Sequence, residues 1–194
     1  MIKKRIIIAS GNNGKIKEIA DILNEYQTIG YKSLGYDFEV EETGSTFYEN
    51  ALLKAQAVMK ATGEVALADD SGLVVNALGG APGIYSARYS GDGDSEHNMD
   101  LLLKNMQGVC DRSAKFVCCI VACFPNGKVL KAEGETLGKI EYEKKGGGGF
   151  GYDPIFFSSD LNKCFGLCSE QEKNSVSHRF RALSKMKELL KNEL

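Results

Sequence analysis

Two adjacent carboxylates, Asp69 and Asp70, lie where an apolar run ends in residues 65–73, VALADDSGL. Neighbouring carboxylates repel each other, and burying either one without a partner costs free energy, so a cation is expected beside them. Because side chains alternate along a strand, only one of the two can face a given ligand if the strand stays extended. Ser71 and Gly72 are expected to turn the chain next, which leaves the Ser71 hydroxyl available to a phosphate.

A second acidic pair, Glu41 and Glu42, lies just before an expected helix N-terminus. Acids are favoured there by the helix dipole, and that effect alone can explain them. The alternative is that one of them binds Mg²⁺, which proteins hold through one or two carboxylates together with substrate phosphates and water. Such an ion would also relieve the repulsion between Asp69 and Asp70. Spacing alone does not decide which member of either pair is the ligand.

The turn SGNNGK, residues 10–15, follows a β-branched run and precedes a helical pattern. Backbone N–H groups and the positive end of a helix form an anion site at such a turn, and Lys15 adds a charge. The turn is not a Walker A loop, because Ala9 and Ile16 stand where that motif needs Gly and Ser or Thr. An ordinary strand-to-helix turn is the alternative.

Basic residues gather at the start of the expected last helix, in residues 173–183, KNSVSHRFRAL. Arg179 in a first turn opposes the helix dipole, and a bound anion would reverse that cost. Lys173, His178 and Arg179 are therefore predicted to contact a ligand. A solvated helix end is the alternative.

A glycine run with aromatic residues follows at 146–154, GGGGFGYDP. Glycines allow close backbone approach, and an aromatic ring beside an acceptor suits a flat, hydrogen-bonding base. Phe150, Tyr152 and Asp153 are therefore candidates for base recognition. The alternative is a hairpin turn with a core aromatic.

The periodicity predicts the elements that position these residues, namely an α/β fold with a mixed sheet flanked by helices. Thr46 and Glu49 form a capping box before one helix, which should end near Gly63. Asn126 and Gly127 predict a hairpin. We expect strands at 4–10, 64–70, 114–124 and 128–140, and helices at 16–26, 46–63, 95–106 and 175–191.

Composition limits the class of protein. The chain has 194 residues, 43% of them hydrophobic, which suits one domain over residues 1–194. Its 24 basic and 26 acidic residues are interspersed, so neither a nucleic-acid partner nor a membrane surface is expected. Neither a membrane span nor a signal segment is expected. The six cysteines are expected to be reduced, mostly core thiols in a cytoplasmic protein.

Five motifs together resemble the inosine triphosphate pyrophosphatase family, the non-standard purine nucleoside triphosphate pyrophosphatases. They are SGNNGK, EETGSTFYENALLKA, ADDSGLVVNALGGAPGIYSARYSG, GGFGYDPIFF and SHRFRAL, in order from residue 8 to about 183. The resemblance implies a Mg²⁺-dependent hydrolase that converts ITP, dITP and XTP to the monophosphate and pyrophosphate. It also implies a homodimer whose subunit is an elongated mixed α/β fold with two lobes, which share a central sheet, around a deep substrate cleft.

The resemblance also assigns roles to residues of this chain. It implies that Glu42 and Asp70 bind the metal, that Asp70 is the catalytic proton acceptor, and that the other matching residues bind substrate. These are Ser10, Gly11, Asn12, Asn13, Gly14, Lys15, Ser71, Phe150, Gly151, Tyr152, Asp153, Lys173, His178 and Arg179. Ser10 and Phe180 depart from the family pattern, where threonine and a small residue are usual.

The resulting hypothesis is that water attacks the α-phosphorus while pyrophosphate leaves, with Lys15 and backbone amides positioning the triphosphate. One alternative is a pyrophosphatase of broader nucleotide specificity. Another is a nucleotide-sensing module that binds without hydrolysis. The preferred substrate among ITP, dITP and XTP and the dimer interface stay open.

Overall fold

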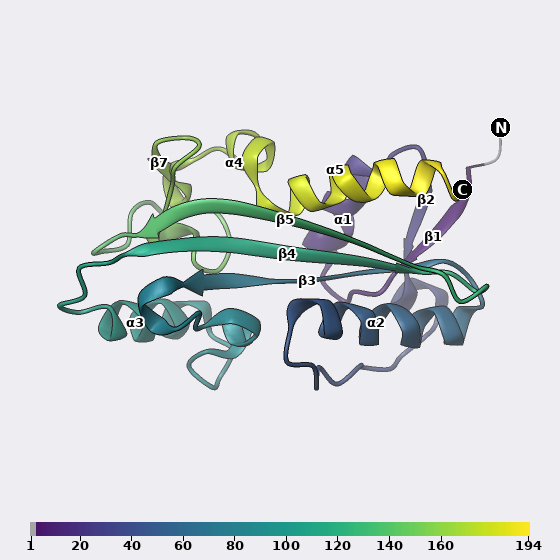
Figure 1. The fold of residues 1–194 in the computed structure, drawn as a ribbon, viewed down its shortest axis with the longest axis horizontal. Coiled ribbons are helices and arrows are strands. Elements are labelled where there is room, and N and C mark those ends of the chain that lie inside the picture. The colour runs from purple at the N-terminus through teal and green to yellow at the C-terminus, as the bar shows by residue number, and fades with distance from the viewer. Residues whose placement is uncertain (1–2) are drawn as a thin grey trace. The chain divides into compact units, whose positions relative to one another are not determined.

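The computed structural model describes residues 3–194, and Figure 1 shows its fold. Among these residues, seven strands form one sheet in the order β2-β1-β3-β4-β5-β6-β7. The strands are β1 (Arg5–Ile8), β2 (Gln27–Gly30), β3 (Ala66–Val75), β4 (Ser113–Cys123), β5 (Val129–Ile140), β6 (Phe156–Ser158) and β7 (Lys163–Cys164). The α-helices are α1 (Asn13–Ile22), α2 (Phe47–Thr62), α3 (Ser95–Asn105), α4 (Glu170–Val176) and α5 (His178–Lys191).

The sheet is mixed, as predicted. Strand β1 pairs in parallel with β2 and β3, whereas β6 pairs antiparallel with both β5 and β7. Parallel neighbours need a crossover, and helices α1 and α2 supply it; antiparallel neighbours can be joined by short turns. Gly127 has a φ of 87° in the predicted hairpin between β4 and β5. The predicted α/β class is therefore confirmed.

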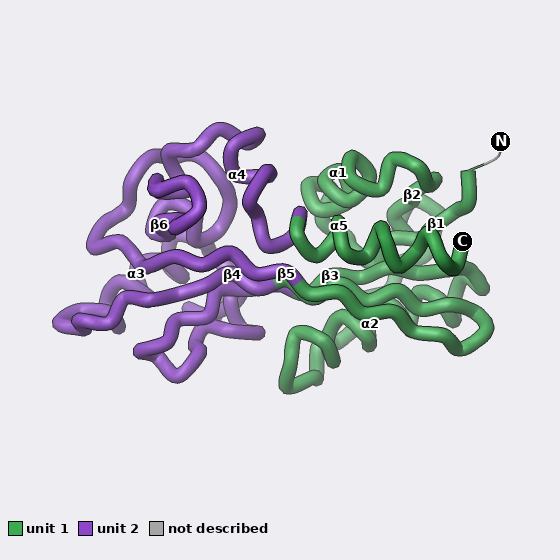
Figure 2. Tube along the Cα trace, turned by 45° about the horizontal axis from the view of Figure 1, so that its top comes forward, with its two compact units in different colours: residues 1–70, 118–133, 181–194 green, residues 71–117, 134–180 purple. Residues whose placement is uncertain are grey.

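The chain divides into two compact units, coloured in Figure 2. Unit 1 comprises residues 1–70, 118–133 and 181–194, and unit 2 comprises residues 71–117 and 134–180. Strands β3, β4 and β5 and helix α5 each contribute residues to both units. The single domain and the two lobes around a cleft stay predictions.

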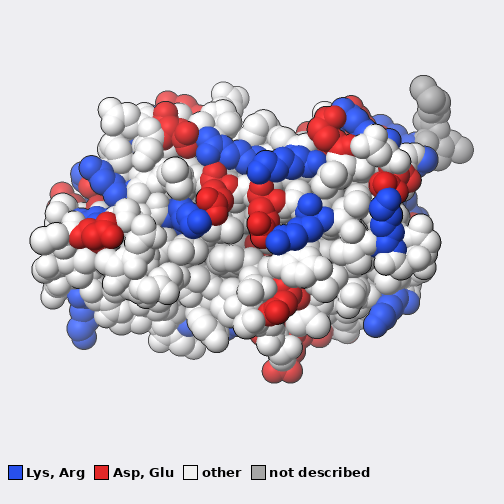
Figure 3. Space-filling view, viewed as in Figure 1, with Lys and Arg blue, Asp and Glu red and all other residues white. Residues whose placement is uncertain are grey.

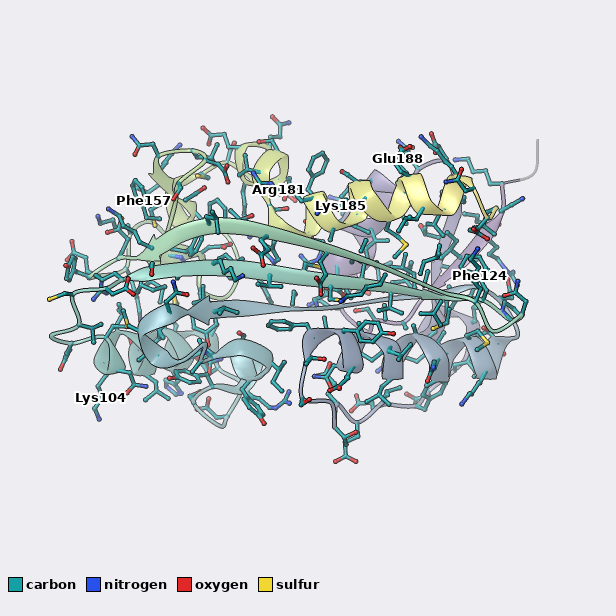
Figure 4. All side chains as sticks on the ribbon, in the orientation of Figure 1. Lys104, Phe124, Phe157, Arg181, Lys185 and Glu188 are labelled. Atoms are coloured by element: carbon teal, nitrogen blue, oxygen red, sulfur yellow. The ribbon has the colours of Figure 1, made fainter. Side chains whose placement is uncertain are left out.

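In unit 1 the sheet is covered by helices on both faces (Figure 1). Ile6 and Ile8 of β1 pack in one buried cluster with residues of α1 and α5, while Ile7 packs in another with residues of α2. This alternation is what a strand buried on both faces requires. Helix α5 is also tied to unit 1 by Lys185, labelled in Figure 4, whose Nζ donates to the Glu133 carbonyl oxygen at 2.7 Å.

Unit 2 has its own core, in which apolar side chains of α3 meet β3, β4 and β5. At its centre the rings of Phe116, Phe156 and Phe165 pack at centroid distances of 4.6 to 6.2 Å. Aromatic pairs in this range add stability beyond the area that they bury. The base-recognition segment predicted at residues 146–154 belongs to this unit.

The predicted ends of α2 are confirmed. The Thr46 hydroxyl accepts from the Glu49 N–H at 3.1 Å, and the Glu49 carboxylate accepts from the Thr46 N–H at 3.2 Å. Gly63 ends the helix with a φ of 69°, a conformation that costs glycine little. Both ends of α2 are thus fixed by local chemistry.

The prediction that Ser71 and Gly72 turn the chain is wrong. Strand β3 continues through both residues to Val75. Leu73 and Val75 are fully buried in the core of unit 2, and the Leu73 N–H donates to the Ser86 hydroxyl at 2.9 Å. Burial of these two side chains keeps the strand extended beyond its acidic pair.

Two helix boundaries also differ from prediction. Helix α1 begins at Asn13 rather than 16 and ends at Ile22, which leaves room for the unpredicted β2. The last helix begins at His178 rather than 175, because the extended Ser177 separates it from α4. The Ser177 hydroxyl accepts from the Phe180 N–H at 3.1 Å, as a helix cap does.

The surface and the thiols agree with the composition. Basic and acidic side chains alternate over the face shown in Figure 3. All six cysteines are free thiols; Cys118, Cys119, Cys123 and Cys164 are buried, whereas Cys110 is exposed. Within residues 3–194, no helix combines the length and apolar character needed to cross a bilayer.

Candidate active site

The two adjacent aspartates project to opposite faces of β3, as strand alternation predicts. Asp69 follows Leu67 on the face that α1 and α5 cover, and Asp70 follows Ala68 on the face that α2 covers. Both are buried, with 2% and 7% of their surfaces exposed. Each therefore needs its own cationic partner.

Asp69 is paired with Lys15. The Lys15 Nζ lies 3.0 Å from Asp69 Oδ2, and the Asp69 side chain is 1% exposed. Lys15 belongs to the first turn of α1, so this ion pair anchors the SGNNGK turn to the end of the parallel strands. Asp69 thus positions Lys15, which is predicted to bind phosphate.

Asp70 shares a different lysine with Glu42. The Lys54 Nζ, from α2, lies 2.7 Å from Glu42 Oε1 and 3.1 Å from Asp70 Oδ1. The two carboxylates come from separate segments, a loop before α2 and strand β3, and they converge on one ammonium group. Glu41 is exposed, so Glu42 is the member of its pair that faces Asp70.

Asn50 fixes the second oxygen of Asp70. Its Nδ2 lies 3.4 Å from Asp70 Oδ2, and its Oδ1 accepts from the Gly44 N–H at 2.8 Å. A Cβ on Gly44 would lie 2.6 Å from the Glu49 Cβ, so only glycine fits there. Asn50 therefore links Asp70 to the loop that carries Glu42.

The electrostatics of this group reflect its burial. Burial raises the pKa of the Asp70 carboxyl above its ordinary value, and Glu42 raises it further, against the opposing effects of Lys54 and Lys15. Burial lowers the pKa of Lys54, but Asp70, Asp69 and Glu42 outweigh that effect and leave the pKa above its ordinary value. Lys54 is thus a cation held by a carboxylate-rich surrounding.

Local hydrogen bonds shape the SGNNGK turn. The Asn12 side chain caps α1 by accepting from the Lys15 N–H at 3.1 Å, and the Ser10 hydroxyl accepts from the Asn12 N–H at 3.1 Å. Gly11, Asn13 and Gly14 are exposed between these residues. The turn therefore presents the N-terminus of a ten-residue helix at the surface of unit 1.

The donor set of unit 1 suits a magnesium ion. Within residues 3–194, no three His, Cys, Asp or Glu side chains are grouped to hold a metal by themselves. Two carboxylates, Glu42 and Asp70, do converge, as the shared Lys54 shows. Mg²⁺ takes hard oxygen ligands and completes its shell with water and substrate phosphates, so two protein carboxylates are sufficient.

In unit 2, Ser71 and Arg179 lie together. The Arg179 Nη2 donates to the Ser71 hydroxyl at 3.2 Å, although the residues are 108 positions apart. Arg179 is the second residue of α5, where the helix dipole disfavours a cation. An anionic ligand beside this guanidinium would be stabilised by its charge and by the N-terminal end of the α5 dipole.

The glycine run holds Asp153 in a fixed position. The Asp153 carboxylate accepts from the Phe150 N–H at 2.5 Å and pairs with the Lys173 ammonium of α4. A Cβ on Gly149, where φ is 90°, would lie 2.3 Å from the Asp153 Oδ2. Asp153 is 1% exposed and Phe150 is 71% exposed. The loop thus exposes the Phe150 ring on a segment that Asp153 holds in place.

Tyr152 and His178 face inward in unit 2. The buried Tyr152 hydroxyl donates to the Ser86 carbonyl oxygen at 2.8 Å, and burial raises its pKa. The His178 ring stacks on Phe116, with centroids 4.9 Å apart and planes 13° apart. Both side chains join their segments to the aromatic core.

The predicted site residues therefore fall into two sets. Unit 1 holds those at the SGNNGK turn and the acidic centre: Ser10, Gly11, Asn12, Asn13, Gly14, Lys15, Glu42 and Asp70. Unit 2 holds the others: Ser71, Phe150, Gly151, Tyr152, Asp153, Lys173, His178 and Arg179. Direct contacts link Ser71 with Arg179, and Phe150 and Lys173 with Asp153. Their roles toward substrate stay predictions.

Sequence reasoning missed Lys54 and Asn50. Both lie on the face of α2 that packs against β3, four residues apart, beside the buried Ala51 and Ala55. A lysine and an asparagine on the apolar face of a helix are a detectable pattern, because buried polar groups need partners. Asp70 is that partner for both.

This chain is similar to known proteins over nearly its whole length. The Ham1 family profile matches residues 6–189. A dITP/XTP pyrophosphatase of Staphylococcus epidermidis is 47% identical over 97% of both chains, and one of Clostridium tetani is 44% identical over 97% of both. The structure of the Staphylococcus aureus Ham1 protein matches with a TM-score of 0.92 at 45% identity, covering 98% of this chain and 100% of that one.

A HAM1 protein structure from Coxiella burnetii matches with a TM-score of 0.91 at 38% identity, covering 97% of this chain and 99% of that one. Both the sequence match and the structural match extend over nearly the whole chain. They confirm the family resemblance found in the sequence motifs. This chain belongs to the Ham1 family.

Proposed function

We propose that this chain hydrolyses the non-standard purine nucleoside triphosphates ITP, dITP and XTP to the nucleoside monophosphate and pyrophosphate, which removes them from the nucleotide pool. The observation that supports this most directly is the convergence of Glu42 and Asp70 on one cation in unit 1. Relatives 44–47% identical that carry the name dITP/XTP pyrophosphatase support the substrate class.

We propose Mg²⁺ as the cofactor, held by Glu42 and Asp70. A divalent ion neutralises the charge of a triphosphate and polarises its phosphoryl oxygens. Lys15, fixed by Asp69, and the backbone N–H groups of the SGNNGK turn bind phosphate oxygens. Asp70 orients the attacking water. With a metal bound beside it, this carboxylate would have a low pKa, so it would be a weak base and chiefly a positioning group for that water.

The second set of residues is proposed to bind the remainder of the substrate. The exposed Phe150 ring offers a face for stacking on a base. Lys173 is a hydrogen-bond donor held by Asp153, and a donor suits the 6-oxo group of hypoxanthine or xanthine, whereas adenine has an amino group there. Ser71, His178 and Arg179 complete the proposed contacts.

The reaction is tested by incubating the protein and Mg²⁺ with ITP, XTP, dITP, ATP and GTP and identifying the products. We expect IMP and pyrophosphate from ITP, with ATP and GTP hydrolysed much more slowly. In water labelled with ¹⁸O, attack at the α-phosphorus places the label in IMP. Release of IDP and phosphate, or label in pyrophosphate, would contradict the proposal, and equal rates with all nucleotides would indicate the broader pyrophosphatase.

We also propose that the protein is a cytoplasmic homodimer without nucleic-acid or membrane partners. Six free thiols suit a reducing compartment, and the interspersed charges offer no basic field. Light scattering coupled to gel filtration measures the oligomeric state, and a monomer at micromolar concentration would contradict the dimer.

A further inference from the structure

Lys54 occupies the point at which the two proposed metal ligands converge. Its Nζ contacts Glu42 Oε1 at 2.7 Å and Asp70 Oδ1 at 3.1 Å. The Lys54 side chain is only 16% exposed, so few water molecules can reach its ammonium group and compete with the two carboxylates. The ammonium group therefore acts as the cation of this centre when no metal is bound.

The backbone of Lys54 is held in place. Helix α2 is fixed by its capping box and by the buried Ala51, Ala55 and Val58. The lysine stem, in contrast, has four rotatable carbons and a single terminal charge. The ammonium group can therefore withdraw from the carboxylates without moving the helix.

A divalent ion and the ammonium group compete for the same oxygens. Two cations that shared Glu42 and Asp70 would repel each other at short range in a partly buried site. Around this centre, three carboxylates already face two ammonium groups, because Lys15 pairs with Asp69. The carboxylates need an added cation only after Lys54 has withdrawn, and Lys54 then needs a new anion.

We propose that Lys54 is an internal counterion of the Glu42–Asp70 centre, which a divalent ion must displace, and that the bound triphosphate supplies the anion for the displaced ammonium. This inference rests on the proposed metal site. It follows that the free protein binds Mg²⁺ weakly and that nucleotide and metal bind with positive coupling. Lys54 is thus a positioning residue that prevents metal from occupying the site before substrate.

The test compares Lys54→Met with wild type by calorimetric titration of Mg²⁺ into the metal-free protein without nucleotide. Methionine retains the length of the stem and removes the charge. We expect Mg²⁺ affinity to rise about tenfold or more, the size of one strong charge interaction in a partly buried site. Lys60→Met, at an exposed position of the same helix, is the matched control and should bind Mg²⁺ as wild type does.

Two further variants separate charge from shape. Lys54→Arg retains the charge and should keep the weak affinity of wild type, whereas Lys54→Gln should bind tightly, as Lys54→Met does. In EDTA the neutral variants should unfold at a lower temperature than wild type, and saturating Mg²⁺ should remove most of that difference. Equal or weaker Mg²⁺ affinity in both neutral variants would overturn the inference.

A non-hydrolysable α,β-methylene analogue of ITP tests the coupling. It should raise the Mg²⁺ affinity of wild type by a larger factor than that of Lys54→Met. Pyrophosphate release from ITP by wild type is measured in the same buffer. If wild type releases pyrophosphate but Lys54→Met binds Mg²⁺ no more tightly than wild type, only the role of Lys54 is overturned. If none of the proteins binds Mg²⁺, the metal site is overturned as well.

Discussion

Lysine–carboxylate pairs occur in both units, but in different proportions. In unit 1, Glu42, Asp69 and Asp70 share Lys15 and Lys54, so carboxylates outnumber ammonium groups. In unit 2, Asp153 forms an ion pair with Lys173 and also accepts a hydrogen bond from the Phe150 N–H. The first group keeps an excess of negative charge, which favours a divalent ion in place of the Lys54 ammonium, whereas the second is already balanced.

The difference indicates which ligand each group suits. A centre with excess carboxylate binds a divalent ion together with phosphates, because added positive charge lowers its energy. A balanced pair instead presents fixed hydrogen-bond donors to a neutral ligand such as a purine base. Lysines and carboxylates therefore serve two purposes, and the ratio of carboxylates to ammonium groups distinguishes the two groups of residues.

The largest expected effect is that of Asp70→Asn on turnover. We expect kcat/KM for ITP to fall about 10²- to 10³-fold, as when a preorganised charged or polar group is removed from a reacting centre. Asp69→Asn, which acts through Lys15, should cost less. Circular dichroism checks that each variant is folded. Near-normal turnover by folded Asp70→Asn would show that the assignment of Asp70 is wrong.

The stability of the same variant relative to wild type should depend on pH. The raised pKa of Asp70 in the folded state means that its contribution to stability is present at acid pH and is lost as pH rises through that pKa. Asparagine has no such pH-dependent loss. Thermal unfolding as a function of pH should therefore show the melting temperature of wild type falling relative to that of Asp70→Asn as pH rises above the ordinary pKa of an aspartate.

In unit 2, removal of the lysine should instead destabilise the fold. Lys173→Met leaves the Asp153 carboxylate, 1% exposed, without its ammonium partner. We expect a loss of about 3 kcal/mol in the free energy of unfolding, typical of a broken buried pair. Urea unfolding measures it.

Two controls define that result. Lys163→Met breaks a surface pair with Glu172 and should cost less than about 1 kcal/mol. Asp153→Asn added to Lys173→Met should restore most of the loss, because the buried charge is then absent. An equal loss in both single lysine variants would contradict the contrast between buried and exposed pairs.

A smaller effect is expected at the glycine run. Gly149→Ala places a Cβ 2.3 Å from the Asp153 Oδ2 at a φ of 90°, so Asp153 must move. We expect a loss of about 1–2 kcal/mol in the free energy of unfolding and a raised KM for ITP. Gly147→Ala is the matched control, because its Cβ would meet no atom within 4 Å. Equal stability in both variants would contradict a structural role for Gly149.

Much of the fold could be predicted from sequence where the cause is local. The capping box of Thr46 and Glu49 and the Asn126–Gly127 turn act within four residues, and both are confirmed. The extension of β3 was missed because it depends on burial of Leu73 and Val75 in unit 2. Ser169 and Glu172 also form a capping box before α4, a local pattern that was overlooked.

The candidate site was predicted unevenly for the same reason. The need for positive charge beside Asp69 and Asp70 follows from their chemistry and is confirmed by Lys15 and Lys54. The position of Lys54 on the apolar face of α2 could be detected, but its partner could not, because that depends on how α2 packs against β3. Residue types therefore predict what a site needs, whereas packing decides which residue supplies it.

The smallest expected effect is that of Tyr152→Phe, which separates positioning in unit 2 from chemistry in unit 1. Loss of the hydrogen bond to the Ser86 carbonyl oxygen should cost about 1 kcal/mol in the free energy of unfolding and raise KM for ITP with little change in kcat. Burial raises the pKa of Tyr152 above its ordinary 10.0, so its contribution to stability is complete below pH 10 and declines as pH rises further. The stability difference between wild type and Tyr152→Phe should therefore stay constant up to about pH 10 and narrow only above it, as measured by urea unfolding. A loss of kcat with unchanged KM would instead place the Tyr152 hydroxyl among the reacting groups.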